Sequence, residues 1–345
     1  MDIQKVLSEA AGKLGPSGQE MEIAEYFAEQ FRPLVDEVTV DSMHNVIAHR
    51  KGTGPRVMLC AHMDEICMMV VDIEDDGCLR LDSVGGVDPR ILPACRVWVH
   101  GREKLFGTIG ALPPHLLTAE DRKKNYDSKD LFVDLGLPVE KVRELVRVGD
   151  PVTFRVPFTQ LMNDQIASKT MDDRACVGIL LLAAERLRRL PCDADVYFVG
   201  TTQEEVGSQG AMTAAFAIDP DLAIALDVDH ATIPGSRPDT TVDGDSLCAT
   251  IGPFIQPKLL QRLIDCAKEH HVKLQTAVSS RRTYTDADEV GLNRAGVPTV
   301  LLSLPLKYMH TSVETIDLLA LREGGRLIAH FLSELDAGWE DDLWI

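Results

Sequence analysis

The chain has 345 residues, 45% of them hydrophobic, which is enough for one large domain and a smaller one. Its 54 acidic residues outnumber the 35 basic ones, and the formal net charge of −19 argues against nucleic acid or an anionic membrane surface as a partner. The N-terminus lacks the basic flank and apolar core of a signal peptide, and no apolar run approaches the roughly 20 residues that span a bilayer. We therefore expect a cytoplasmic protein.

The first part of the chain predicts two helices and then three strands. Helices are expected at 3–14 and 19–31, from apolar residues spaced three and four apart, and strands at 38–40, 46–48 and 57–61. The last of these strands is apolar enough to be buried on both faces.

That buried strand runs directly into His62-Met63-Asp64. Residues two apart lie on the same side of an extended backbone, so Asp64 could accept a hydrogen bond from the His62 ring nitrogen that does not bind a metal. The simpler interpretation is a histidine that ends a strand and contacts water, and the pair alone favours it.

The sequence pattern differs between residues 66 and 165, where helical periodicity is nearly absent. Short segments with frequent Gly, Pro and Asp predict strands at 68–73, 78–81, 96–99 and 152–155, one helix at 138–146, and a charged surface loop at 121–130. Interleaved acids make that loop a poor candidate for a basic binding patch. We expect residues 66–165 to form a small β domain, inserted into a discontinuous catalytic domain of residues 1–65 and 166–345.

Alternation of helices and strands resumes at Ser168. A helix is expected at 176–187, and strands at 196–200, 222–226, 247–251, 273–278 and 298–304. Further helices are expected at 257–270, after Thr285, and from about 314 to 335.

Acidic residues and histidines follow several of these elements. Asp172 and Asp173 precede a helix, where capping would explain one aspartate and leave the other spare. Glu204 and Glu205 follow a strand, and this pair alone fits either a solvated turn or a site. Asp227 ends the next strand and His310 follows the last one.

Ligands in open α/β sheets lie outside the carboxyl ends of the strands, so these side chains are expected to converge there. Their oxygen and nitrogen atoms, with no thiolate, suit two divalent ions such as zinc, cobalt or manganese. The proposed ligands are His62, one of Asp172 or Asp173, Glu205, Asp227 and His310. Glu204 could then carry a proton between an activated water and a leaving amine, which describes amide hydrolysis.

Four motifs occur in the order found in one family of peptidases: Ala-His-Met-Asp-Glu-Ile at 61–66, Met-Asp-Asp-Arg-Ala at 171–175, Thr-Gln-Glu-Glu-Val-Gly at 202–207 and Tyr-Met-His-Thr at 308–311. The chain resembles the tetrahedral aminopeptidases, which include glutamyl and deblocking aminopeptidases. Segments 85–90 and 110–116 also resemble that family's inserted domain, so the likeness covers nearly the whole chain.

The resemblance implies a fold and a set of roles. We expect an α/β protein: a three-layer α/β/α catalytic domain with a mixed, mostly parallel sheet, and an inserted, barrel-like dimerisation domain. Asp172 would bridge two divalent ions, most simply Zn²⁺ with Co²⁺ or Mn²⁺ as alternatives, and His62, Glu205, Asp227 and His310 would complete their coordination. Glu204 would be the general base and Asp64 would orient His62. Dimers would assemble into hollow tetrahedral dodecamers that act on peptides with a free N-terminus.

Two other functions fit parts of the pattern. One is a metal-dependent deacylase or amidohydrolase of small N-acyl compounds, and the other is an assembly protein with an idle site. The presence of every proposed ligand and of the base argues against the idle site. Asp229 stands where the family commonly has threonine, and with Asp286 and Asp288 it could favour a basic substrate side chain; alternatively, these acids bind the substrate amine or pair with Arg281 and Arg282.

Eight cysteines are spread along the chain without a Cys-x-x-Cys pair. This pattern favours reduced thiols over a disulfide framework, and it lacks the spacing typical of zinc–thiolate sites.

Overall fold

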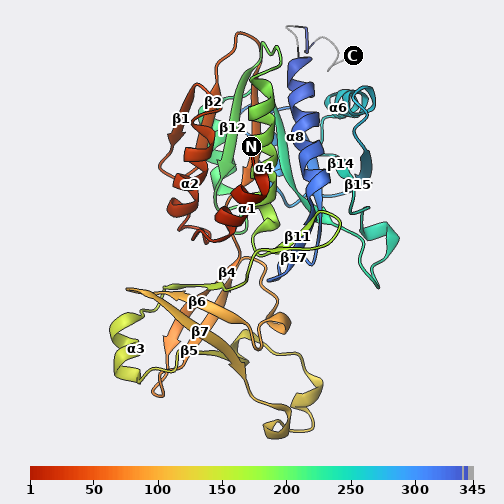
Figure 1. Cartoon of the computed structure of the whole chain (residues 1–345). Coiled ribbons are helices and arrows are strands. Elements are labelled where there is room, and N and C mark those ends of the chain that lie inside the picture. Colours follow the sequence, from red (N-terminus) through yellow and green to blue (C-terminus); the bar gives the residue numbers. More distant parts are fainter. Residues whose placement is uncertain (336–337, 341–345) are drawn as a thin grey trace. The chain divides into compact units, whose positions relative to one another are not determined.

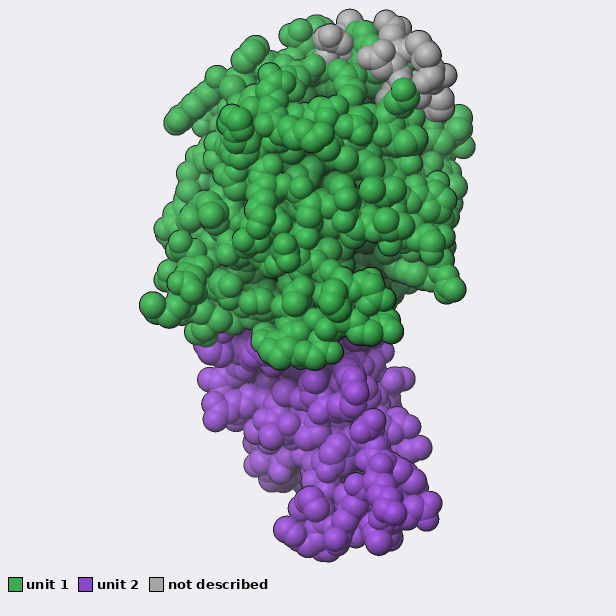
Figure 2. Space-filling view, turned by 90° about the vertical axis from the view of Figure 1, so that its right-hand side faces the viewer, with its two compact units in different colours: residues 1–64, 158–309, 314–345 green, residues 65–157, 310–313 purple. Residues whose placement is uncertain are grey.

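The computed structural model describes residues 1–335 and 338–340, and the chain divides into two compact units. The first unit comprises 1–64, 158–309 and the described residues from 314 onward, and the second comprises 65–157 and 310–313. Figure 1 traces the elements of each unit, and Figure 2 shows the first unit in green and the second in purple.

The first unit is built on one mixed β-sheet. Its strands are β1 (Glu37–Val40), β2 (Val46–Arg50), β3 (Arg56–His62), β10 (Thr159–Gln160), β11 (Gln165–Ser168), β12 (Asp195–Thr201), β13 (Leu222–His230), β14 (Leu247–Ile251), β15 (Leu274–Val278), β16 (Thr299–Lys307) and β17 (Glu314–Asp317). The main order is β1-β2-β12-β3-β13-β16-β17-β11-β10, and β14 joins β16 to β15. The central strands β12, β3, β13 and β16 are parallel, whereas the strands on both sides of this group pair antiparallel.

Helices cover the sheet because its central strands are apolar on both faces. The helices are α1 (Ile3–Ala11), α2 (Met21–Phe31), α4 (Met171–Leu187), α5 (Gln209–Ile218), α6 (Pro257–Glu269), α7 (Asp286–Gly291) and α8 (Leu318–Ser333). β3 is buried from Val57 to its end, which only cover on both sides explains. Helix α4 packs on α8, as Figure 1 shows, and on β3. Helices α5 and α7 pack on each other and on the sheet. None of the helices in the described residues is long and apolar enough to cross a membrane.

The last helix begins later than the sequence predicted. We expected a helix from about 314, but Glu314–Asp317 forms β17, which pairs with β11 on one side and β16 on the other. The helix starts at Leu318, where the Asp317 carboxylate accepts hydrogen bonds from the backbone amides of Leu319 and Ala320. Pairing with two neighbours overrides the local helical pattern at this point.

The second unit is a closed barrel with one α-helix and four short 3-10 helices. Its strands are β4 (Cys67–Ile73), β5 (Leu79–Val84), β6 (Arg96–His100), β7 (Lys104–Ala111), β8 (Leu131–Asp134) and β9 (Pro151–Phe154), and its helix is α3 (Val139–Leu145). The order β4-β5-β8-β7-β6-β9 closes because β9 also pairs with β4, and every pair is antiparallel. Buried residues such as Val70, Val97 and Val133 fill the barrel. The expected fold class, an α/β domain with a small barrel, is thereby confirmed.

Candidate metal centre

Three neighbouring parallel strands carry candidate ligands to one edge of the sheet. His62 is the last residue of β3 and lies opposite Thr201, the last residue of β12. Ala225 of β13 pairs with Cys60 of β3, so the same register two residues further on brings Asp227 level with His62. The carboxyl ends of these strands therefore place an imidazole beside a carboxylate, as expected for an open α/β sheet.

The start of α4 adds two more carboxylates. Asp172 and Asp173 have non-helical backbone angles, and Thr170 at the N-cap makes no side-chain capping hydrogen bond. Both are buried, and the two oxygens of Asp173 lack hydrogen-bond partners. Capping, the plainer explanation of this pair, therefore does not account for Asp173.

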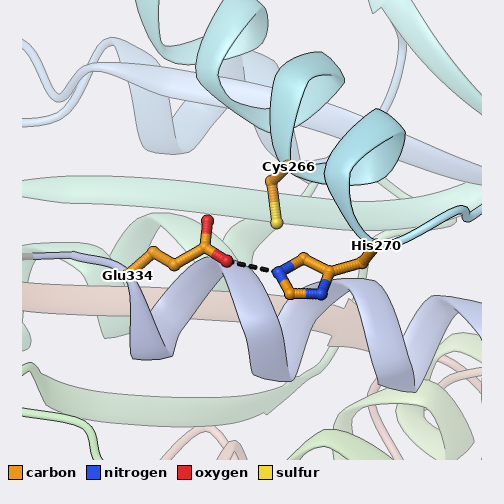
Figure 3. A group of neighbouring side chains, drawn as sticks. All are labelled: Cys266, His270 and Glu334. Carbon is orange, nitrogen blue, oxygen red and sulfur yellow. Dashed lines mark hydrogen bonds and ion pairs between the residues drawn. The ribbon is translucent and has the colours of Figure 1, made fainter.

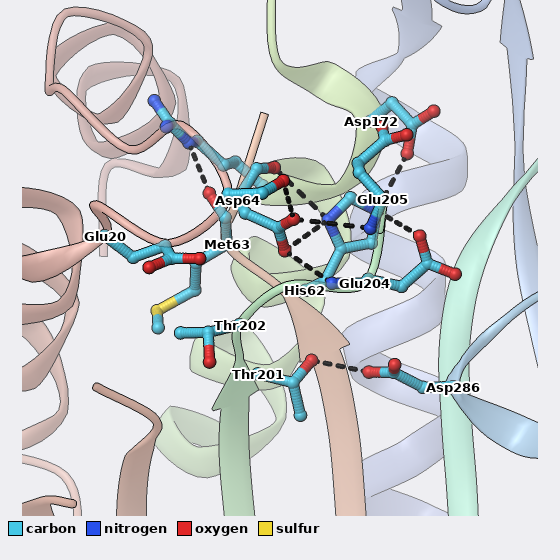
Figure 4. Close-up of polar contacts among 12 residues, drawn as sticks. Glu20, His62, Met63, Asp64, Asp172, Thr201, Thr202, Glu204, Glu205 and Asp286 are labelled. Atoms are coloured by element: carbon cyan, nitrogen blue, oxygen red, sulfur yellow. Dashed lines mark hydrogen bonds and ion pairs between the residues drawn. The ribbon is translucent and has the colours of Figure 1, made fainter. Parts of the chain in front are cut away.

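Two overlapping groups of ligand atoms share His62. The first group consists of His62, Asp172 and Glu205, and the second of His62, Asp173 and Asp227. Within each group, one ligand atom from each residue lies within 4.8 Å of the other two. The Nε2 atom of His62 is 3.0 Å from Oδ1 of Asp172 (Figure 4). The structure thus gathers four of the five proposed ligands and adds Asp173, which we had held as the alternative to Asp172.

Asp64 lies on the other side of the His62 ring and is completely buried. Its Oδ1 atom is 3.4 Å from Nδ1 of His62, and its carbonyl oxygen is 3.2 Å from the same nitrogen. Its carboxylate also accepts hydrogen bonds from the Ser17 hydroxyl at 2.7 Å and from the backbone amides of Glu204 and Glu205 at 3.1 and 3.3 Å. One carboxylate therefore links the imidazole to the loop that carries both glutamates.

Electrostatics around His62 are dominated by carboxylates. Burial lowers the pKa of His62, but hydrogen bonds to Asp172 and Asp64 outweigh it and raise the pKa well above its ordinary value. Burial raises the pKa of Asp64, but His62, Ser17 and the Glu204 amide lower it to a net value below its ordinary one.

The pKa values of three other carboxyl groups are raised, in contrast to that of Asp64. Burial, then the charges of Asp227, Asp286 and Glu205, raise the pKa of Glu204 to about 10 against the effect of His62. Burial likewise raises the pKa values of Asp173 and Asp227 well above the ordinary value, and repulsion between the two contributes to the shift of Asp173. The carboxylates lie close enough together for their negative charges to repel one another, which favours their protonated forms.

Divalent cations fit this arrangement on two grounds. The donor set of one imidazole and several carboxylates is the one that zinc, cobalt and manganese accept. A cation would also pair with the unpartnered oxygens of Asp173 and offset the repulsion that raises these carboxyl pKa values.

His310 groups with residues of the second unit. Its Nδ1 atom is 3.1 Å from the carbonyl oxygen of Gly86. A Cβ atom at Gly86 would lie only 2.4 Å from the same nitrogen, so glycine is required for this close approach. The assignment of His310 as a ligand stays a prediction.

Sequence reasoning missed the residues that support the cluster. Arg174 is completely buried; its Nε atom donates to the Met63 carbonyl at 2.9 Å, and Nη1 donates to the carbonyls of Ala10 and Lys13 at 2.7 and 3.0 Å. An arginine at the start of an apolar helix was the only available signal. Glu314 accepts a hydrogen bond from the Asp172 amide at 3.1 Å, and nothing in its local sequence indicated this.

An α/β sheet that gathers an imidazole and several buried carboxylates at its carboxyl edge defines a metal-dependent hydrolase. Comparison with known proteins gives the family. Residues 44–327 match the peptidase family described as M42 glutamyl aminopeptidase, and the chain belongs to that family. It is a metal-dependent aminopeptidase.

Relatives and solved structures agree with this assignment. The chain is 38% identical over 327 residues to the lysyl aminopeptidase of Pyrococcus furiosus, covering 93% of this chain and 94% of that protein. It superposes with a TM-score of 0.94 and 31% identity on a TET aminopeptidase from a marine sediment Thaumarchaeota archaeon, covering 99% of this chain and 98% of the other. It also matches a Pyrococcus horikoshii peptidase that can assemble into a tetrahedron or a large octahedral shell, with a TM-score of 0.85, 30% identity, and coverage of 97% and 100%.

Proposed function

We propose that this aminopeptidase removes N-terminal residues from peptides with the help of two divalent ions. The ligands would be His62, Asp172, Glu205, Asp227 and His310, and the ions would be Zn²⁺, with Co²⁺ or Mn²⁺ as alternatives. The observation that carries the proposal is the pair of ligand groups that share His62. Bound ions of this kind polarise a carbonyl and bring the pKa of a coordinated water near neutrality.

Glu204 is the proposed proton carrier. Its Oε2 atom is 4.0 Å from Nε2 of His62, so the carboxyl group faces the ligand cluster, as Figure 4 shows. Burial and neighbouring carboxylates give it an affinity for protons far above that of a surface glutamate, and positive charge nearby would lower that affinity. A carboxyl group tuned in this way can accept a proton from water and return it to the leaving amine.

Asp64 is the proposed orienting residue. It holds the Nδ1 side of His62, which leaves Nε2 directed at Asp172. Carboxylates that hold the far side of a ligand histidine fix its orientation and raise its basicity.

A comparison of Glu204→Gln with Glu205→Gln tests the two adjacent roles. Glu204→Gln should keep its metal content and lose about 10²–10⁴-fold in kcat on aminoacyl amides, the range of a general base. Glu205→Gln should lose bound metal, measured by elemental analysis, because it removes a charged ligand. Normal turnover by Glu204→Gln, or equal metal loss in both variants, would overturn the assignment.

The cavity beside β13 supports a preference for basic N-terminal residues. A cavity of about 510 Å³ is lined by Asp229, Asp239 and several threonines. Asp229 lies two residues beyond Asp227, so both side chains point to the same face of β13. Asp288, in contrast, accepts hydrogen bonds from Arg282, Thr283 and Tyr284 and is already engaged.

We therefore propose lysyl and arginyl peptides as preferred substrates, with Asp229 facing the basic group. Lysyl, leucyl and glutamyl amides should be compared in the wild type and in Asp229→Asn. The wild type should prefer lysyl amides, and the variant should lose that preference through a higher KM. Faster turnover of glutamyl amides would refute the idea, and activity on N-blocked amides would instead favour a deacylase.

We also propose that barrels of residues 66–165 join subunits into dimers and that dimers assemble into a tetrahedral dodecamer. Support comes from the shell-forming Pyrococcus horikoshii peptidase, which shares the whole fold. Light scattering of the purified protein should give about twelve chains per particle; a monomer would contradict the proposal. The cytoplasm suits the eight free cysteines, because thiols persist in reducing compartments.

A further inference from the structure

Helices α6 and α8 pack together, and near their C-terminal ends they bring three metal-binding residue types into one cluster. Cys266 lies in α6, and His270 caps the same helix four residues later. Residues four apart share one helix face. Glu334 caps α8 and faces this pair, as Figure 3 shows.

The three side chains are close enough to share an ion. The Sγ atom of Cys266, a ring nitrogen of His270 and a carboxylate oxygen of Glu334 all lie within 4.8 Å of one another. Tetrahedral zinc with ordinary bond lengths needs ligand atoms roughly 3.4–3.6 Å apart. His270 and Glu334 are in direct hydrogen-bond contact, so an ion that binds here takes the place of that hydrogen bond and moves the two side chains apart.

Neighbouring contacts hold the cluster in place. Nε2 of His270 hydrogen-bonds Oε1 of Glu334, and the His330 ring stacks on the His270 ring with centroids 3.7 Å apart. Arg326 fixes the end of α6 by donating from Nη1 to the His270 carbonyl at 2.6 Å. These contacts keep the three side chains together at the ends of the two helices.

Charge and access also suit a divalent ion. Cys266 is 4% exposed, but His270 and Glu334 are 24% and 41% exposed along their side chains, so an ion can enter from solution. Burial, then the charge of Glu334, raises the pKa of the Cys266 thiol to about 12, so the thiol keeps its proton at neutral pH in the absence of an ion. A bound dication reverses that effect, because a coordinating thiol loses its proton. Thiolate and carboxylate together neutralise its charge.

We propose that Cys266, His270 and Glu334 bind one additional divalent ion of the zinc type, which clamps the end of α6 to the end of α8. The sixteen residues of α8 separate this site from β17, whose Glu314 contacts Asp172, by about 24 Å along the helix axis. The clamp is therefore structural. The missing Cys-x-x-Cys spacing does not exclude it, because the third ligand comes from a distant helix.

Cobalt spectroscopy of the full-length protein tests the site independently of catalysis. The proposed catalytic ligands contain no sulfur, so a thiolate-to-cobalt charge-transfer band in the near ultraviolet would report this cluster. We expect the band in the Co²⁺-loaded wild type, its loss in Cys266→Ser and His270→Gln, and its retention in Cys176→Ser. Cys176 is the matched control because its thiol donates to the Asp227 carbonyl beside the catalytic cluster.

Elemental analysis completes the test. After loading with Zn²⁺ and removal of free metal, Cys266→Ser and His270→Gln should each hold one zinc fewer per chain than the wild type. Equal zinc content in wild type and both variants, or a cobalt band that disappears in Cys176→Ser instead, would overturn the proposal.

Discussion

Replacing Asp64 with asparagine tests whether this buried carboxylate orients His62. In the wild type, Oδ1 accepts from the Glu204 amide, and Oδ2 accepts from the Ser17 hydroxyl and the Glu205 amide. Asparagine has the same shape but only one accepting oxygen. The Ser17 hydroxyl can rotate to accept from the new NH₂ group, whereas a backbone amide cannot reverse. Either orientation of the asparagine therefore leaves one part-buried amide without its partner.

The expected cost follows from that count. One unpaired buried donor costs about 1–3 kcal/mol of folding free energy. Loss of the partner of a ligand histidine typically weakens metal binding by about 10–100-fold. Because the Asp64 pKa is lowered in the folded protein, its charge stabilises the fold above the ordinary value of 3.8 and ceases to do so as pH falls through the lowered value. The stability gap between wild type and Asp64→Asn should narrow in acid accordingly.

Urea unfolding of the metal-free proteins at neutral pH and calorimetric titration with Zn²⁺ measure both effects. Ser17→Ala is the control, since it removes a donor to Asp64 and leaves the carboxylate and both amide bonds. It should bind metal almost normally. If Asp64→Asn bound Zn²⁺ as tightly as the wild type, Asp64 would not orient a ligand, whatever happened to stability.

Two further predictions concern residues near these groups. Burial raises the pKa of Glu20 to about 7 from 4.5, so the folded protein holds this proton more tightly than the unfolded chain and stability should fall as pH rises between those values. Glu20→Gln should remove that decline in urea unfolding measured across the window; an unchanged profile would assign the decline to other groups. Gly86→Ala should displace His310, because the added Cβ would lie 2.4 Å from Nδ1, and should lower bound metal on elemental analysis. Gly244→Ala, whose Cβ would meet atoms no nearer than 3.7 Å, is the control, and equal metal content in both would argue against His310 as a ligand.

The sequence by itself determined the class of fold and the residue types that meet at the candidate site. His62 ends β3 and Glu204 follows β12, and parallel strands bring such ends to one edge of the sheet. Asp227 lies level with His62, although it stands inside β13, which continues to His230. The imidazole and carboxylate side chains then limit the bound ion to a hard or borderline cation. These are local patterns, and the structure departs from one of them: the strand predicted at 222–226 continues to His230 because it pairs with β16 along that length.

Only the tertiary structure decided what depends on pairing between distant segments. The sequence alone does not distinguish Asp172 from its neighbour Asp173. In the structure, Asp172 contacts His62 and lies near Glu205, whereas Asp173 lies near His62 and Asp227. The helix predicted from 314 became a strand because β11 and β16 were available to pair with it. Glu334 reaches His270 only because α6 and α8 pack together. The local sequence sets the spacing of apolar residues that favours a helix or a strand. The elements that pack beside a residue decide whether it is buried, which charges surround it and which groups it contacts.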